Sequence, residues 1–160
     1  MSSNGHWQFN VLVGAATIYD KKFLVLKRSS RESFLPAVWG IPAGQIEEDE
    51  DPSDACRREL FEETGLHGQV REPIGYSTFS SYRGSMKLNN IQLNFLVSVT
   101  DSEVKLNPAS HSEYEWISLD DVDNSELLDA FTRDIIKSAR DALKDETEHE
   151  PVGQPARGYR

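Results

Sequence analysis

The sequence contains one cysteine, no long apolar run and no excess of basic residues. Cys56 has no partner for an intramolecular disulfide, which favours a reducing compartment. The longest nearly apolar run, Asn10 to Ile18, is about half the length of a membrane span. The first ten residues have neither a basic start nor an apolar stretch. We therefore expect a soluble, cytoplasmic protein.

Basic side chains are in the minority, because 17 Lys and Arg stand against 27 Asp and Glu and give a formal net charge of −10. Duplex nucleic acid and anionic membranes are bound through clustered Lys and Arg, so this balance argues against both as partners. A phosphorylated partner would need something other than net charge to neutralise it. A chain of 160 residues predicts one domain that folds without a disulfide or a structural metal.

Hydrophobic periodicity predicts strands through most of the chain. The apolar runs are short and are separated by polar turns or by glycine and proline. Strands with one helix inserted and one appended indicate a single mixed α/β layer fold. The predicted strand regions are 7–18, 23–26, 39–44, 69–82, 87–100 and 114–119.

Two helices are predicted by different signals. Asp51 and Pro52 are typical of a helix start and Gly65 of a helix end, so the first helix is expected from about 52 to 64. The second helix is predicted by apolar residues whose spacing fits one buried face. Those residues are Leu127, Leu128, Phe131, Ile135, Ile136, Ala139 and Leu143.

The end of the chain is poor in apolar residues. Between Asp145 and Arg160 only Val152, Ala156 and Tyr159 are apolar, so burial cannot offset the entropy cost of ordering this segment. We expect a domain over 1–144 and a flexible C-terminal tail over 145–160.

Acidic residues concentrate between Gly44 and Leu66, where nine of 23 residues are Asp or Glu. On a helical wheel Glu59, Glu62 and Glu63 fall within about 100° of one another, beside small and apolar residues. A solvated helix face is the alternative, but this stripe borders the buried face. Packed carboxylates repel one another unless a cation offsets their charge. The stripe therefore predicts a divalent cation site, with Mg²⁺ the usual ion where phosphate supplies further ligands and Mn²⁺ a substitute.

The same segment carries a motif of nine specified positions: Gly44, Glu50, Arg58, Glu59, Leu60, Glu62, Glu63, Gly65 and Leu66. In residue type and spacing it resembles the signature of the Nudix hydrolases. The flanking segments 24–28, 39–44 and 115–120 are similar to the family as well. The resemblance implies an α/β/α sandwich around a mixed β-sheet. It also implies an Mg²⁺-dependent pyrophosphohydrolase that cleaves the diphosphate linkage of nucleoside diphosphate-X compounds, such as (d)NTPs, modified nucleotides or dinucleoside polyphosphates.

The resemblance further implies roles for single residues. Glu59, Glu62 and Glu63 would be catalytic and would hold the metal, with the Gly44 carbonyl as a further ligand. Arg58 would be a catalytic residue that orients these carboxylates, and an ordinary surface ion pair is its alternative role.

The general base stays open at this point. Glu59 is one possibility, and Glu113 or Glu115 near the late strand are others, because some members of the family use a carboxylate outside the motif. Glu50 would be either a metal ligand or an acceptor that anchors the helix.

Substrate-binding residues are expected outside the motif. Arg28 at the end of the second strand is expected to contact phosphate. Trp39 and Tyr82 are expected to stack on a base, with core packing as their alternative. Cys56 is expected to be a small core residue and not a nucleophile. The expected partner is thus a phosphorylated small molecule, and a homodimer is compatible with the sequence.

Two other function classes stay open. A non-catalytic nucleotide-sensing module would share the fold but need not keep the catalytic carboxylates, all of which are present here. A relative of isopentenyl diphosphate isomerase would use different acid and base residues. The intact run from Arg58 to Glu63 therefore favours hydrolysis.

Overall fold

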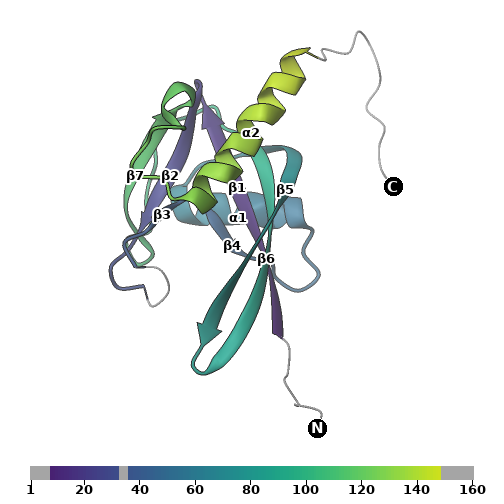
Figure 1. Ribbon diagram of the computed structural model, residues 1–160, viewed down its shortest axis with the longest axis vertical. Helices are drawn as coiled ribbons and strands as arrows, with labels where there is room; N and C mark the ends of the chain where they lie inside the picture. The colour runs from purple at the N-terminus through teal and green to yellow at the C-terminus, as the bar shows by residue number, and fades with distance from the viewer. Residues whose placement is uncertain (1–7, 33–35, 149–160) are drawn as a thin grey trace.

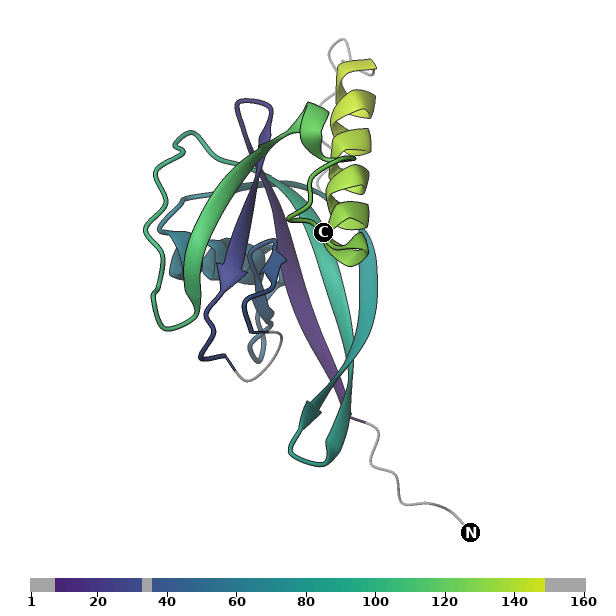
Figure 2. The ribbon, with the colours of Figure 1, turned by 60° about the vertical axis from the view of Figure 1, so that its left-hand side comes forward.

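The fold is one curved β-sheet of seven strands between two helices, with α1 on one face and α2 on the other (Figures 1 and 2). The computed structural model describes residues 8–32 and 36–148. This arrangement confirms the predicted α/β sandwich. The elements are β1 Gln8–Tyr19, β2 Lys22–Arg28, β3 Trp39–Gly40, β4 Ala43–Gln45, α1 Pro52–Thr64, β5 Gln69–Arg83, β6 Met86–Ser98, β7 His111–Ser118, a 3₁₀ turn Leu119–Asp121 and α2 Ala130–Glu148.

The sheet combines local hairpins with one long parallel pairing. Its strand order is β3-β2-β1-β6-β5, while β4 pairs with β1 and β7 with β2. β1 and β6 run parallel from Gln8 opposite Leu88 to Ile18 opposite Ser98. β5 and β6 form an antiparallel hairpin whose distal part projects from the body of the molecule (Figure 1). β1 and β6 therefore form the centre of the sheet, and β5 forms one edge.

The strands predicted at 7–18 and 23–26 are confirmed, and they form a hairpin whose turn has a clear backbone signature. Ile18 lies opposite Phe23 and Tyr19 opposite Lys22, which leaves a two-residue turn. Asp20 and Lys21 both have positive φ, at 45° and 59°. Two successive positive φ angles are typical of the turns that match the right-handed twist of a hairpin.

Each face of the sheet has its own apolar core. On one face Ala55, Cys56 and Leu60 of α1 pack with Phe95 and other residues of the sheet. On the other face, α2 packs against sheet residues that alternate with the first set. Alternate side chains of a strand point to opposite faces, so this double covering explains the largely apolar centre of the sheet.

α1 has the bounds that the sequence predicts. The Asp51 carboxylate accepts the Ser53 N–H at 2.8 Å, and Pro52 is the first helical residue. At the other end Gly65 has a φ of 73° and donates its N–H to the Phe61 carbonyl at 2.8 Å. These caps fix both ends of the helix that carries the carboxylate stripe.

α2 differs from the prediction at both ends. Leu127 and Leu128 precede the helix, and Leu127 and Phe131 are each 38% exposed, so the prediction of one buried face is wrong for these two side chains. The helix continues through 145–148, and Glu146 forms an ion pair with Arg71 at 3.1 Å. The rest of the predicted tail, 149–160, lies outside the described residues. No helix in the described ranges is long and apolar enough to cross a membrane.

Candidate active site

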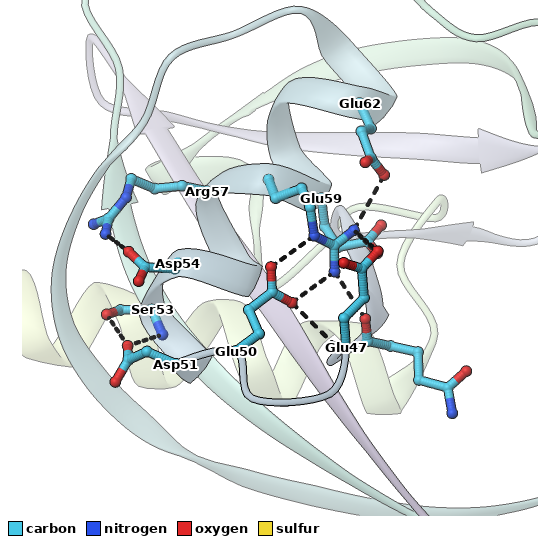
Figure 3. Close-up of polar contacts among 10 residues, drawn as sticks. Glu47, Glu50, Asp51, Ser53, Asp54, Arg57, Glu59 and Glu62 are labelled. Atoms are coloured by element: carbon cyan, nitrogen blue, oxygen red, sulfur yellow. Dashed lines mark hydrogen bonds and ion pairs between the residues drawn. The ribbon is translucent and has the colours of Figure 1, made fainter.

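One guanidinium group contacts two carboxylates of α1, Glu59 and Glu62, and the carboxylate of Glu50 in the loop before it (Figure 3). Arg58 donates to Glu50 through Nε at 2.8 Å and through Nη2 at 2.9 Å. Its Nη1 donates to Glu59 at 2.9 Å and to Glu62 at 3.2 Å. Nη2 also donates to the Gln45 carbonyl at 3.0 Å. Arg58 thus joins β4, the loop after it and two carboxylates of the helix.

This arrangement gives Glu50 the anchoring role. Its carboxylate also accepts the Glu47 N–H at 3.1 Å, so it closes the loop before α1. The hydrogen bond from Arg58, helped by the Glu47 N–H, lowers the pKa of Glu50 to about 2. The same pairing raises the pKa of Arg58. Glu50 and Arg58 therefore stay charged together across the physiological range.

Glu63 and Glu59 have the opposite electrostatic character. Burial raises the pKa of Glu63 well above its ordinary value, and the negative charge of Glu59 raises it further. The Ala43 N–H, which donates to Glu63 at 3.2 Å, acts against these effects. Burial also raises the pKa of Glu59, although Arg58 opposes the shift. We call Glu59, Glu62 and Glu63 together the carboxylate edge of α1. At Glu59 and Glu63 this edge remains short of positive charge.

Gly44 lies directly against the Glu59 carboxylate. A Cβ atom added to Gly44 would come within 2.0 Å of the Glu59 Cδ atom, a distance that no side chain tolerates. The missing side chain therefore leaves the carboxylate room beside the β4 backbone. A close approach of a strand to a helix is one of the functions for which only glycine is suitable.

The donor chemistry of this edge suits a hard divalent cation. Glu59, Glu62 and Glu63 offer carboxylate oxygens, and the place beside Gly44 is free of any Cβ. Within 8–32 and 36–148, however, no three acidic, histidine or cysteine side chains are arranged so that they could hold a metal ion as they stand. Arg58 donates to Glu59 and Glu62 and would have to share their oxygens with a bound ion.

The predicted substrate residues occupy three different places. Arg28 forms an ion pair with Glu32 at 3.2 Å, and its charge also acts on Glu63. Trp39 is half-buried and packs against the core on the α2 side. Tyr82 is 68% exposed near the end of β5, and no contact in the described part of the chain joins it to the Arg58 cluster. Of the three residues, only Arg28 lies close enough to affect the carboxylate edge.

The two alternative bases lie on the other face of the sheet. Glu113 and Glu115 alternate with Trp116 and share the face of Ile117, which packs toward α2. Glu113 forms an ion pair with Lys27 at 2.9 Å. Glu59, by contrast, lies within the cluster around Arg58. Cys56 is buried and burial raises its pKa to about 12, which confirms its core role.

A chain of side-chain hydrogen bonds crosses four strands on the face of the sheet opposite α1, and sequence reasoning missed it. Gln45 donates to Asn10 at 3.2 Å, Asn10 to Asn90 at 3.3 Å, and Asn90 to Ser81 at 2.9 Å. Asn90 is only 4% exposed. The amides at alternate positions of β6 were the available signal, but Asn10, one of the partners of Asn90, lies on a strand distant in the sequence. This chain of amides ties the strand of Gly44 to the β5–β6 hairpin.

His111 gives the site region a pH-dependent stability. Burial and the Arg28 charge lower its pKa, and Glu32 opposes them. The folded protein therefore takes up this proton less readily than the unfolded chain. The contribution of His111 to the free energy of unfolding is nil above its ordinary pKa of about 6.5 and becomes destabilising as the pH falls below it.

Replacing His111 with glutamine should therefore flatten the fall in melting temperature between pH 7 and pH 5, as measured by circular dichroism. His67, which is exposed beside Phe61, provides the matched control, and His67→Gln should keep the wild-type slope. Parallel melting curves for wild type and His111→Gln would show that His111 has no such effect.

A family model described as the NUDIX domain matches residues 9–139 of this chain. An RNA pyrophosphohydrolase of Bartonella henselae is 34% identical over 104 residues, which are 51% of this chain and 57% of that protein. The m7GpppN-mRNA hydrolase NUDT17 of Homo sapiens is 34% identical over 116 residues, 63% of this chain and 35% of that protein. The match thus spans less than two thirds of the length of these curated relatives.

Solved structures agree with the described fold. The crystal structure of a MutT protein from Methanosarcina mazei Go1 matches with a TM-score of 0.70 and 27% sequence identity. The match covers 87% of this chain and 98% of that one. The similarity therefore extends over the sheet and both helices and is not limited to the motif.

Proposed function

The chain belongs to the Nudix family, and from this premise we propose that it is a pyrophosphohydrolase that depends on Mg²⁺, or on Mn²⁺ as a substitute. Its substrates would be compounds in which a nucleoside diphosphate is linked to a further group X. Water would attack one phosphorus atom, the phosphoanhydride P–O bond would break, and a nucleoside monophosphate and the phosphorylated X group would leave.

One observation supports this proposal most strongly: the carboxylates of Glu59 and Glu63 both lie against β4, Glu59 beside the bare backbone of Gly44 and Glu63 on the Ala43 N–H. Burial raises the pKa of both carboxyl groups, so a cation that offsets their negative charge would be favourable there. A divalent cation bound there would polarise the phosphate oxygens and neutralise the charge of an acidic substrate. This explains how a chain with a net charge of −10 could bind a phosphorylated substrate.

The chain's own residues would divide the remaining work. Glu59, whose pKa is raised by burial, would accept the proton of the attacking water. Arg58 would hold Glu59 and Glu62 in place through its planar donors. The Ala43 N–H would fix the position of Glu63. Arg28, at the end of β2, would add positive charge toward a bound phosphate.

A substrate screen with product analysis tests the proposal. Purified protein should release a nucleoside monophosphate or pyrophosphate from at least one member of a panel of (d)NTPs, modified nucleotides, nucleotide sugars and dinucleoside polyphosphates. Because curated relatives are named RNA pyrophosphohydrolase and m7GpppN-mRNA hydrolase, the panel includes an RNA oligonucleotide with a 5′-triphosphate. Excess chelator should abolish turnover and added Mg²⁺ should restore it. Full activity in chelator would contradict the metal-dependent mechanism.

A further inference from the structure

β5 forms an open edge of the sheet. It lies last in the strand order, and in the described part of the chain it pairs only with β6. From Tyr76 to Tyr82 its side chains alternate between the two faces. Tyr76 is 74% exposed and Tyr82 is 68% exposed, both on the α1 side, where they share a face with Leu93 and Lys87. α1 does not reach this part of the sheet (Figure 2).

The protection that sheet edges usually carry is confined to the first half of β5. An open edge is normally blocked by charged residues, proline or bulges, because unpaired backbone groups recruit another strand. Here Arg71, Glu72 and Pro73 supply the charges and the proline. The two irregularities in the pairing with β6 also fall before residue 76. The segment from Tyr76 to Tyr82 has none of these features, so a partner strand can approach it.

The same unprotected segment is nearly symmetric in sequence. It reads Tyr-Ser-Thr-Phe-Ser-Ser-Tyr, with Phe79 at its centre. If two copies pair antiparallel about Phe79, Tyr76 lies opposite the tyrosine at position 82 of the other copy, and Thr78 opposite the serine at position 80. Aromatic pairs and hydroxyl pairs directly opposite each other stabilise antiparallel strands.

Charge also favours a second copy of the chain, and not a nucleic acid, as the partner of this β5 segment. Two chains of net charge −10 repel each other overall, and the segment from Ile74 to Tyr82 contains no charged residue. Two copies can therefore meet there without bringing like charges together. A nucleic acid would need clustered basic residues, and this segment has none.

We propose that the chain forms a two-fold symmetric dimer in which the β5 segments Tyr76–Tyr82 of two copies pair antiparallel about Phe79 and join the two sheets. The pairing would satisfy the outward backbone N–H and C=O groups of both edges. It would also place the two Phe79 rings, each near the Phe131 of its own chain, on either side of the symmetry axis. This interface does not depend on the proposed hydrolase activity.

A pair of charge variants tests the interface by sedimentation. Thr78 and Ser80 are exposed, so their replacement leaves the core intact. Thr78→Lys with Ser80→Lys places lysine opposite lysine at both symmetric positions, and we expect the dimer dissociation constant to rise at least about tenfold. Thr78→Lys with Ser80→Glu places lysine opposite glutamate and should remain dimeric. Identical sedimentation of the two variants, or a wild type that is monomeric at every concentration, would overturn the proposal.

Disulfide formation tests the register itself. Residues directly opposite each other in an antiparallel pair have Cα atoms about 4.5 to 5.5 Å apart, which is within the range of a disulfide. A mixture of Thr78→Cys and Ser80→Cys proteins should therefore give a covalent dimer of the two different chains on mild oxidation. Each variant alone should give much less, because equal positions lie farther apart. If each variant alone cross-linked as well as the mixture, this register would be ruled out.

Discussion

Replacing Glu63 or Glu59 with glutamine should lower kcat by about two orders of magnitude or more, while the far-UV circular dichroism stays unchanged. Each substitution removes a negative charge from the carboxylate edge but no packing volume. The glutamine at 63 keeps an oxygen that can accept the Ala43 N–H. Glu59 would lose its capacity as a base as well. The measurement is steady-state turnover on the best substrate of the screen.

Glu48 provides the matched control for these variants. It belongs to the same acidic segment but is exposed in the loop before α1. Glu48→Gln makes the same chemical change there and should keep the wild-type kcat. If Glu63→Gln or Glu59→Gln also kept the wild-type rate, the assignment of that residue to the site would be wrong.

Gly44→Ala should lower kcat by at least about tenfold with little loss of melting temperature. The new Cβ would lie within 2.0 Å of the Glu59 Cδ atom. Because that carboxylate is the end of a flexible side chain, it can move away without disturbing the core. The substitution would therefore displace the Glu59 carboxylate but leave the fold intact.

Gly40→Ala is the control for this prediction. Gly40 ends β3, four residues before Gly44, but a Cβ there would meet only Thr132 Oγ1, at 4.0 Å, which is an ordinary contact. This variant should keep both turnover and stability. Equal losses of turnover and stability in Gly40→Ala and Gly44→Ala would indicate that the whole segment from β3 to β4, and not the approach of Gly44 to Glu59, is sensitive to substitution.

Local signals predicted α1 and the first two strands correctly. Asp51, Pro52 and Gly65 determine the ends of α1 through backbone geometry that involves only nearby residues. Structure that depends on a few consecutive residues can be predicted from sequence in this way.

Features that depend on distant residues could not be predicted. The parallel pairing of β1 with β6 joins segments about eighty residues apart, and Asn90 and Asn94 of β6 are both buried. The hydrogen bonds from Arg58 to Glu50 and Gln45 depend on the path of the loop before α1, which no periodicity encodes. Likewise, periodicity gave no sign that Glu113 and Glu115 lie on the face opposite α1.

The measurement that tests the proposed site most directly is the shift in melting temperature on addition of Mg²⁺ or Mn²⁺. A cation that binds only the folded protein stabilises it by RT ln(1 + [M]/Kd), about 2.7 kcal/mol at a hundredfold excess over Kd. Wild type and Glu48→Gln should show this shift in full. A variant that carries both Glu59→Gln and Glu63→Gln should show almost none. Equal shifts in all three proteins would contradict a metal site at the carboxylate edge of α1.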